Sequence, residues 1–166
     1  LNLAQRGLLN IEMEFIENAP IILFRMLPII RLFVENHLIQ FYDQKSLQSK
    51  IAVVYSSLIQ YLYDQLDNSS RPTYLTTRCF DDLMRCINWF PDEKKHWYQN
   101  WLGYIQHRIG NRQISLTLLE SALEACQGNN PKLEIAVLNN LGQVHLHSGL
   151  PLVAKSFFEK RMPVDP

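Results

Sequence analysis

The sequence predicts an all-α protein, an α-solenoid in which about eight helices pair into antiparallel hairpins and the hairpins stack in order. Three observations lead to this prediction. Apolar residues recur through most of the chain at the three- and four-residue spacing of a helix. We find no useful run in which apolar and polar residues alternate with the period of a strand, so a sheet is not expected. Turn-forming residues separate the periodic segments.

The clearest helix is expected over residues 46–66, with Ser46 at its start, because Leu47, Val54 and Leu58 share one apolar face. The full set of predicted helices covers residues 2–17, 20–42, 46–66, 73–90, 93–109, 112–126, 132–147 and 151–161. Short turns rich in Asn, Gly and Pro join them. The longest of these turns, residues 67–72 (DNSSRP), predicts a boundary between an N-terminal helical segment (residues 1–70) and helical repeats (residues 71–166).

Composition excludes some classes of function. Sixteen basic and sixteen acidic residues leave no net charge, so nucleic-acid binding is not expected. The most apolar stretch, residues 19–34, is interrupted by Arg25, Pro28 and Arg31 before it reaches the ~20 residues of a membrane-spanning helix. The chain begins within a helical pattern and without Met, so we expect a piece of a longer protein. Its three cysteines are expected to be reduced core residues of a cytoplasmic protein.

An internal repeat runs through the second half of the chain. The spacing from Gly103 to Gly142 is the same as the spacing from Gly110 to Gly149, and we call it the repeat spacing. A small residue on a helix lets a second helix approach closely, so large residues are expected to face these glycines. The positions expected to pack the hairpins in this way are Leu102, Gly103, Leu119, Leu141, Gly142, Ala154 and Phe158. One hairpin cannot bury both of its faces, so its neighbours must stack on it.

The run from Leu138 to Pro166, L-x2-L-G-x2-H-x8-A-x3-F-x7-P, resembles a tetratricopeptide repeat. The preceding unit is similar, although Ser115 replaces the usual alanine and the repeat spacing exceeds the standard repeat of about 34 residues. The resemblance covers residues 96–166, and extending it to residues 1–95 as degenerate repeats is an extrapolation. Repeats of this length are similar to those in bacterial signalling ATPases and peptide-sensing regulators. The resemblance implies a right-handed superhelix that binds proteins.

In this family the first helix of each hairpin lines a concave groove that holds a peptide. By resemblance, the partner-binding groove here consists of Asn100, Trp101, Tyr104, His107, Arg108, Asn139, Asn140, Gln143 and His147, with Trp97 on the same stripe. Carboxamides can both donate to and accept from peptide groups. Trp97 and Trp101 could equally fill the space between hairpins, and both alternatives stay open. Asn100 and Asn139 replace the cations of the family's carboxylate clamp, so capture of an acidic C-terminus is not expected.

No catalytic, metal-binding or cofactor-binding motif is found, and no enzymatic activity is expected. His145 and His147 point in nearly opposite directions on a helix and cannot share one metal ion. His145 takes the place of a packing aromatic residue. His96 and His107 share a stripe, but no carboxylate completes a site there.

The leading hypothesis is therefore a cytoplasmic, non-catalytic scaffolding or regulatory module that binds a peptide or a partner protein. One alternative is a peptide sensor that gates an effector domain. Another is a homo-oligomer formed through the uncapped C-terminal face and the apolar second predicted helix, with Phe157, Phe158, Ile21, Ile22 and Phe24 as candidate contacts.

Overall fold

The computed structural model describes residues 9–26 and 43–161, apart from the side chains of Phe24, Met26, Asp92 and Glu93. The chain divides into two compact units, residues 1–50 and 51–166. The described part of the first unit is a β-hairpin followed by the start of a helix. The second unit is helical throughout its described residues.

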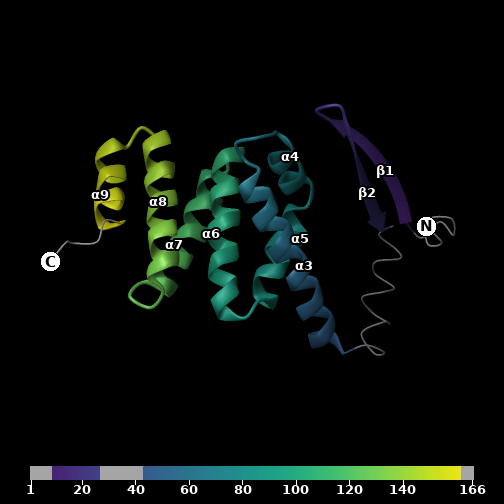
Figure 1. Ribbon diagram of the computed structural model, residues 1–166, viewed down its shortest axis with the longest axis horizontal. Helices are drawn as coiled ribbons and strands as arrows, with labels where there is room; N and C mark the ends of the chain where they lie inside the picture. Colours follow the sequence, from purple (N-terminus) through teal and green to yellow (C-terminus); the bar gives the residue numbers. More distant parts are fainter. Residues whose placement is uncertain (1–8, 27–42, 162–166) are drawn as a thin grey trace. The chain divides into compact units, whose positions relative to one another are not determined.

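The β-hairpin consists of β1 (Leu9–Ile16) and β2 (Ala19–Met26), which pair antiparallel (Figure 1). Glu17 and Asn18 form the two-residue connection, and both have positive φ, at 52° and 61°. This backbone matches the twist of paired strands, and Asn tolerates it better than most residues do. The tight turn therefore fixes the register in which Ile16 faces Ala19.

The helices predicted over 2–17 and 20–42 are wrong wherever the structure describes those residues. The segment LNIEMEF (residues 9–15) alternates apolar and polar side chains, which is the period of a strand. The density of apolar residues in this segment also favours a helix, and short apolar runs do not distinguish helix from strand. The rest of the two predicted helices lies outside the described residues. Ile22 is exposed and Ile21 half-buried, on opposite faces of β2.

The helices from residue 43 onward follow the predicted ones closely in the second half of the chain. They are α3 (Gln44–Asp64), α4 (Arg71–Arg78), α5 (Phe80–Cys86), the short 3-10 helix η2 (Ile87–Trp89), α6 (Asp92–Ile109), α7 (Arg112–Cys126), α8 (Pro131–His147) and α9 (Pro151–Arg161). The predictions for residues 46–66, 93–109, 112–126, 132–147 and 151–161 are confirmed to within a few residues. Helix α3 begins at Gln44 instead of Ser46, since the Asp43 carboxylate accepts a hydrogen bond from the Lys45 amide.

The single helix predicted over residues 73–90 is wrong, because the chain breaks it at Cys79, whose φ is −106° and ψ 13°. The Thr73 and Thr77 hydroxyls donate to the carbonyl oxygens of Ser70 and Thr73 within α4. Such side-chain bonds compete with the helical backbone ladder and often accompany bends. The short 3-10 helix η2 then connects α5 to α6.

Successive helices from α6 to α9 pack as antiparallel neighbours, and α6 also contacts α8 (Figure 1). The two hairpins repeat one contact at the repeat spacing. A Cβ added at Gly103 would press on Leu119, and one added at Gly142 would overlap the ring of Phe158. Ser115 and its counterpart Ala154 are both buried. The small-against-large packing expected from the repeat is therefore present in both hairpins.

The helix boundaries carry the same repeat spacing. It separates the first residues of α6 and α8, and it also separates the first residues of α7 and α9. Gly110 and Gly149 follow α6 and α8 with φ of 99° and 73°, where an L-residue would be strained. The two hairpins thus have the same kind of connecting turn and the same kind of small-against-large contact.

Helices α6 and α8 run in the same direction. Asn100 and His107 of α6 meet Asn140 and His147 of α8. Towards the N-terminus, the Tyr63 ring of α3 lies against the Tyr104 ring of α6, at 5.7 Å between centroids. Asp67, just beyond α3, pairs with Arg108. Because the two contacts of α6 with α8 join residues at one constant spacing, these two helices are parallel, and a side-chain contact connects α3 to α6.

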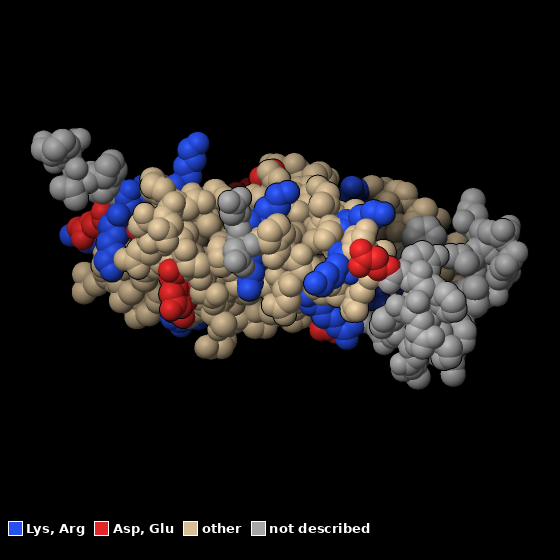
Figure 2. Space-filling view, turned by 90° about the horizontal axis from the view of Figure 1, so that it is seen from below, with Lys and Arg blue, Asp and Glu red and all other residues tan. Residues whose placement is uncertain are grey.

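None of the described helices is long and apolar enough to cross a membrane. The face of the described helices seen in Figure 2 is mostly uncharged, with basic and acidic side chains spread across it. This distribution agrees with the absence of net charge in the sequence.

Candidate functional site

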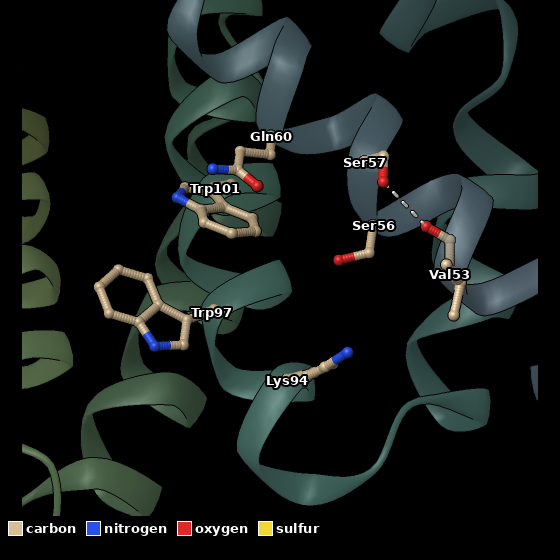
Figure 3. A pocket seen from close by; sticks show the side chains of 7 residues that line it. All are labelled: Val53, Ser56, Ser57, Gln60, Lys94, Trp97 and Trp101. Atoms are coloured by element: carbon tan, nitrogen blue, oxygen red, sulfur yellow. Dashed lines mark hydrogen bonds between the residues drawn. The ribbon is translucent and has the colours of Figure 1, made fainter.

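A hollow of about 320 Å³ lies between α3 and α6, and we call it the α3–α6 pocket (Figure 3). One wall is a stripe of α3 and the other the first half of α6. Its lining residues are Val53, Ser56, Ser57, Gln60, Lys94, Trp97 and Trp101. The pocket exists because small polar side chains of α3 face two large indoles of α6 and do not fill the space between the helices.

Trp97 and Trp101 form the aromatic wall of the α3–α6 pocket. They are one helical turn apart on α6, and their ring centroids lie 5.7 Å apart with a tilt of 35°. Each indole also packs against a hydrophobic core cluster, Trp97 with the cluster between α7 and α8 and Trp101 with the cluster around α3 and α6. Both side chains are half-buried. The two alternatives left open by the sequence are therefore combined, since each indole packs in the core and also faces a cavity.

The other lining residues supply polar groups of several kinds. Gln60 is exposed and offers both a donor and an acceptor. The Ser57 hydroxyl donates to the Val53 carbonyl oxygen at 3.2 Å, so its oxygen can still accept a hydrogen bond. Lys94 is the one charged residue in this lining. An apolar side chain with peptide groups beside it would match this arrangement of an aromatic wall and a hydrogen-bonding wall.

Asn100 and Asn140, two of the predicted groove residues, do not lie on an open surface. They are 1% and 2% exposed, and the Asn140 amide donates to the Asn100 carbonyl oxygen at 3.0 Å. Burial raises the pKa of Tyr63 in α3, and a hydrogen bond with Asn140 opposes that rise. The prediction that these amides face a ligand is corrected for a physical reason. Buried amides need partners, and these two satisfy each other between α6 and α8.

His107 and His147 form a second contact between α6 and α8, in addition to the Asn100–Asn140 hydrogen bond. Their rings are nearly coplanar, with 2.9 Å between His107 Nε2 and His147 Nδ1, so one nitrogen must donate and the other accept. Burial, His147, Arg108 and Arg112 lower the pKa of His107, in that order of effect. Because the same arginines oppose any added positive charge, we assign these histidines to the contact between helices and not to a cation site.

The remaining predicted groove residues occupy different environments. Asn139 is half-buried and accepts a hydrogen bond of 2.7 Å from Arg161. Gln143 and Tyr104 are half-buried, and Tyr104 packs on Tyr63. Arg108 is exposed and pairs with Asp67. Of the predicted groove, the structure brings Trp101 into the α3–α6 pocket together with Trp97. The other predicted groove residues except Gln143 contact a neighbouring helix or the segment that follows α3.

Other reactive side chains are held in unreactive forms. Burial raises the pKa of Cys86 to about 11 and also raises the pKa of Cys79 and Cys126, so all three thiols are protonated at neutral pH. His145 stacks on Phe157 at 5.2 Å, as expected for a packing aromatic. Among the described residues, no three His, Cys, Asp or Glu side chains gather in a way that could hold a metal ion.

Comparison with protein-family models, with curated proteins and with solved structures gives no match.

Sequence analysis missed the α3 wall of the pocket, formed by Val53, Ser56, Ser57 and Gln60. A signal was available. Ser56, Ser57 and Gln60 interrupt the apolar pattern of the strongest predicted helix on one side. Their meaning depends on which helix stacks beside α3, and that partner lies about one repeat spacing away in the sequence.

Proposed function

We propose that this chain is a non-catalytic module of stacked helical hairpins that binds an extended peptide segment of a partner protein in the α3–α6 pocket. The observation that carries the proposal is the pocket itself, with two indoles opposite hydroxyl and carboxamide groups. Aromatic anchors bury large area at low entropic cost and dominate many peptide interfaces.

The repeated hairpin contact supports the architecture on which this proposal depends. Gly103 with Leu119 and Gly142 with Phe158 hold two successive hairpins in the same geometry. Helices α3, α6 and α8 are then the parallel first helices of three successive layers, as in a tetratricopeptide-like superhelix. In such a stack the first helices form one continuous surface, and the residues that line the α3–α6 pocket belong to two of these helices.

The ligand is expected to be an apolar or aromatic residue within an extended peptide. Its side chain would lie between Trp97, Trp101 and Val53, while Gln60 would bond to a neighbouring peptide group. Lys94 favours a nearby acidic residue, although a surface charge contributes little affinity. We do not expect a clamp for an acidic C-terminus, since the buried Asn100 cannot serve as a cation.

Tryptophan fluorescence can test this proposal in the full chain. The chain has three tryptophans, and two of them line the pocket, so a Trp89→Phe variant reports on the pocket alone. Peptides selected for binding from a random display library should shift the emission of this variant. Replacing Gln60 by Ala should raise the Kd several-fold, corresponding to about 1 kcal/mol for one hydrogen bond.

A matched control is Gln113→Ala, because Gln113 is also exposed on a helix but lies on α7, outside the pocket. Its Kd should equal that of the parent. Peptides that bind the parent, Gln60→Ala and Trp101→Ala variants with the same Kd would refute the assignment, provided that the variants melt at the parental temperature.

A further inference from the structure

The outer face of the last hairpin carries a second hollow, of about 370 Å³. It is lined by Leu146, Pro151, Ala154, Lys155, Phe158 and Glu159, and we call it the α8–α9 face. Leu146 is 44% exposed, and Leu150 and Val153 beside it are exposed to a similar degree. An apolar hollow rimmed by charged residues is a typical interaction surface.

The preceding hairpin shows what covers a face of this kind. One repeat spacing earlier in the chain, the counterparts of Leu146, Ala154 and Phe158 are His107, Ser115 and Leu119. Helix α8 contacts two of these three positions. Leu119 is fully buried in one cluster with apolar residues of α8, and His147 of α8 meets His107. The stripe of α8 that packs with Leu119 consists of Leu133, Val137, Leu141 and Val144.

From this continuity with the interface inside the chain, we infer that the α8–α9 face binds an amphipathic helix of a partner protein, lying parallel to α8. The partner's apolar residues would follow the spacing of the α8 stripe, at positions i, i+4, i+8 and i+11. Among the described residues, no helix follows α9 to take this place. The inference is independent of the α3–α6 pocket.

The differences between the two faces define the chemistry of this partner helix. Leu146, Ala154 and Phe158 include no polar side chain, whereas the corresponding positions of the covered face include His107 and Ser115. The partner stripe should therefore be wholly apolar, with no histidine opposite Leu146. At the rim, Lys155 and Glu159 form an exposed ion pair of 3.6 Å. Charged residues of both signs on the flanks of the partner helix would complement this pair.

A peptide made from α8 itself is the probe for this test. It carries the sequence of residues 131–147 with His147 replaced by Leu, a helix-stabilising side-chain staple on its outer side, and a fluorescent label. Fluorescence anisotropy with the full chain should show saturable binding. The Leu146→Glu variant should weaken binding about tenfold or more, because a carboxylate would be buried beneath the helix. A peptide whose four stripe residues are Ser should not bind.

Leu152→Glu is the matched control, since Leu152 is 82% exposed on α9 and does not line the hollow. It should leave the Kd within about twofold of the parent. If circular dichroism shows that Leu146→Glu fails to fold, Pro151→Glu replaces it, since Pro151 is exposed and also lines the hollow. Absence of saturable binding, or equal binding by Leu146→Glu and parent, would overturn the inference. Sedimentation showing a dimer that Leu146→Glu dissociates would also overturn it, because the occupant would then be a second copy.

Discussion

At the scale of single residues, the hairpins depend on contacts in which one small residue meets one large one. Gly142 is buried in α8 with the Phe158 ring against it, and Gly103 is buried in α6 with Leu119 against it. A glycine inside a helix costs about 1 kcal/mol relative to alanine, so its presence needs a reason in packing. The close approach of the returning helix is that reason.

Replacing Gly142 by Ala should therefore destabilise the chain although it raises helix propensity. The new methyl group would overlap the Phe158 ring, and overpacking costs about 1 to 3 kcal/mol, which outweighs the gain in propensity. Urea unfolding measures the loss. In Phe158→Ala protein the same substitution should be neutral or stabilising, because the overlapping ring is gone. Equal effects in the two backgrounds would show that Gly142 and Phe158 are not in contact.

The buried amide pair gives a second test at this scale. Asn140→Ala should destabilise the chain by about 1 to 3 kcal/mol, since it leaves the Asn100 amide buried without its partner. The double variant Asn100→Ala/Asn140→Ala should lose less than the sum of the two single changes. Thermal and urea unfolding of the two single variants and the double variant measure these losses and complete a double-mutant cycle. Strict additivity would contradict the hydrogen bond between the two side chains.

At the scale of elements, the sequence predicted the C-terminal helices well and the N-terminal segment poorly. Helices α6 to α9 have flanking Gly, Asn or Pro residues and strong periodicity, so their ends are predictable within a few residues. The hairpin β1–β2 was missed because its alternation is only about seven residues long and β2 is almost continuously apolar. No Gly or Pro stands next to Cys79, so the sequence gives no signal that a helix ends there.

The turn of the hairpin can be tested separately from the helices. Asn18→Gly should stabilise β1–β2 and Asn18→Val should weaken it, because Asn18 has a φ of 61° and a β-branched residue is strained there by roughly 1 to 2 kcal/mol. Amide hydrogen exchange across residues 9–26 measures the change. Slower exchange in the Val variant than in the Gly variant would contradict the positive φ.

At the scale of the helical unit, the binding surface arises from pairings that local sequence does not specify. Asn100 and Asn139 are equivalent in the repeat, yet the first is buried against Asn140 and the second accepts from Arg161. The repeat predicted which residues are equivalent but not which layer covers each of them. Similarly, the polar stripe of α3 acquires a role only when Trp97 and Trp101 stack opposite it.

Two histidines make this stacking sensitive to pH. Burial and nearby positive charge lower the pKa of His107 between α6 and α8, and that of His145 between α8 and α9. A depressed pKa means that the unfolded chain binds protons more readily than the folded chain as the pH falls below about 6.5. The contribution of these two groups to the free energy of unfolding should thus be constant above that pH. Below that pH the contribution should decrease as the pH falls, until the pH is lower than the pKa values of the two histidines in the folded chain.

Urea unfolding between pH 5 and 8 measures this dependence, with the paired variant His107→Gln/His145→Phe as the comparison. The new glutamine can still bond to His147 and the new phenylalanine can still stack on Phe157, but neither titrates in this range. The variant should lose less stability than the parent between pH 7 and pH 5. His96→Gln is the control, since His96 also bonds within its own helix, to Gln99, without linking two layers. A parent and a paired variant with the same pH profile would show that these contacts do not couple protonation to the stack.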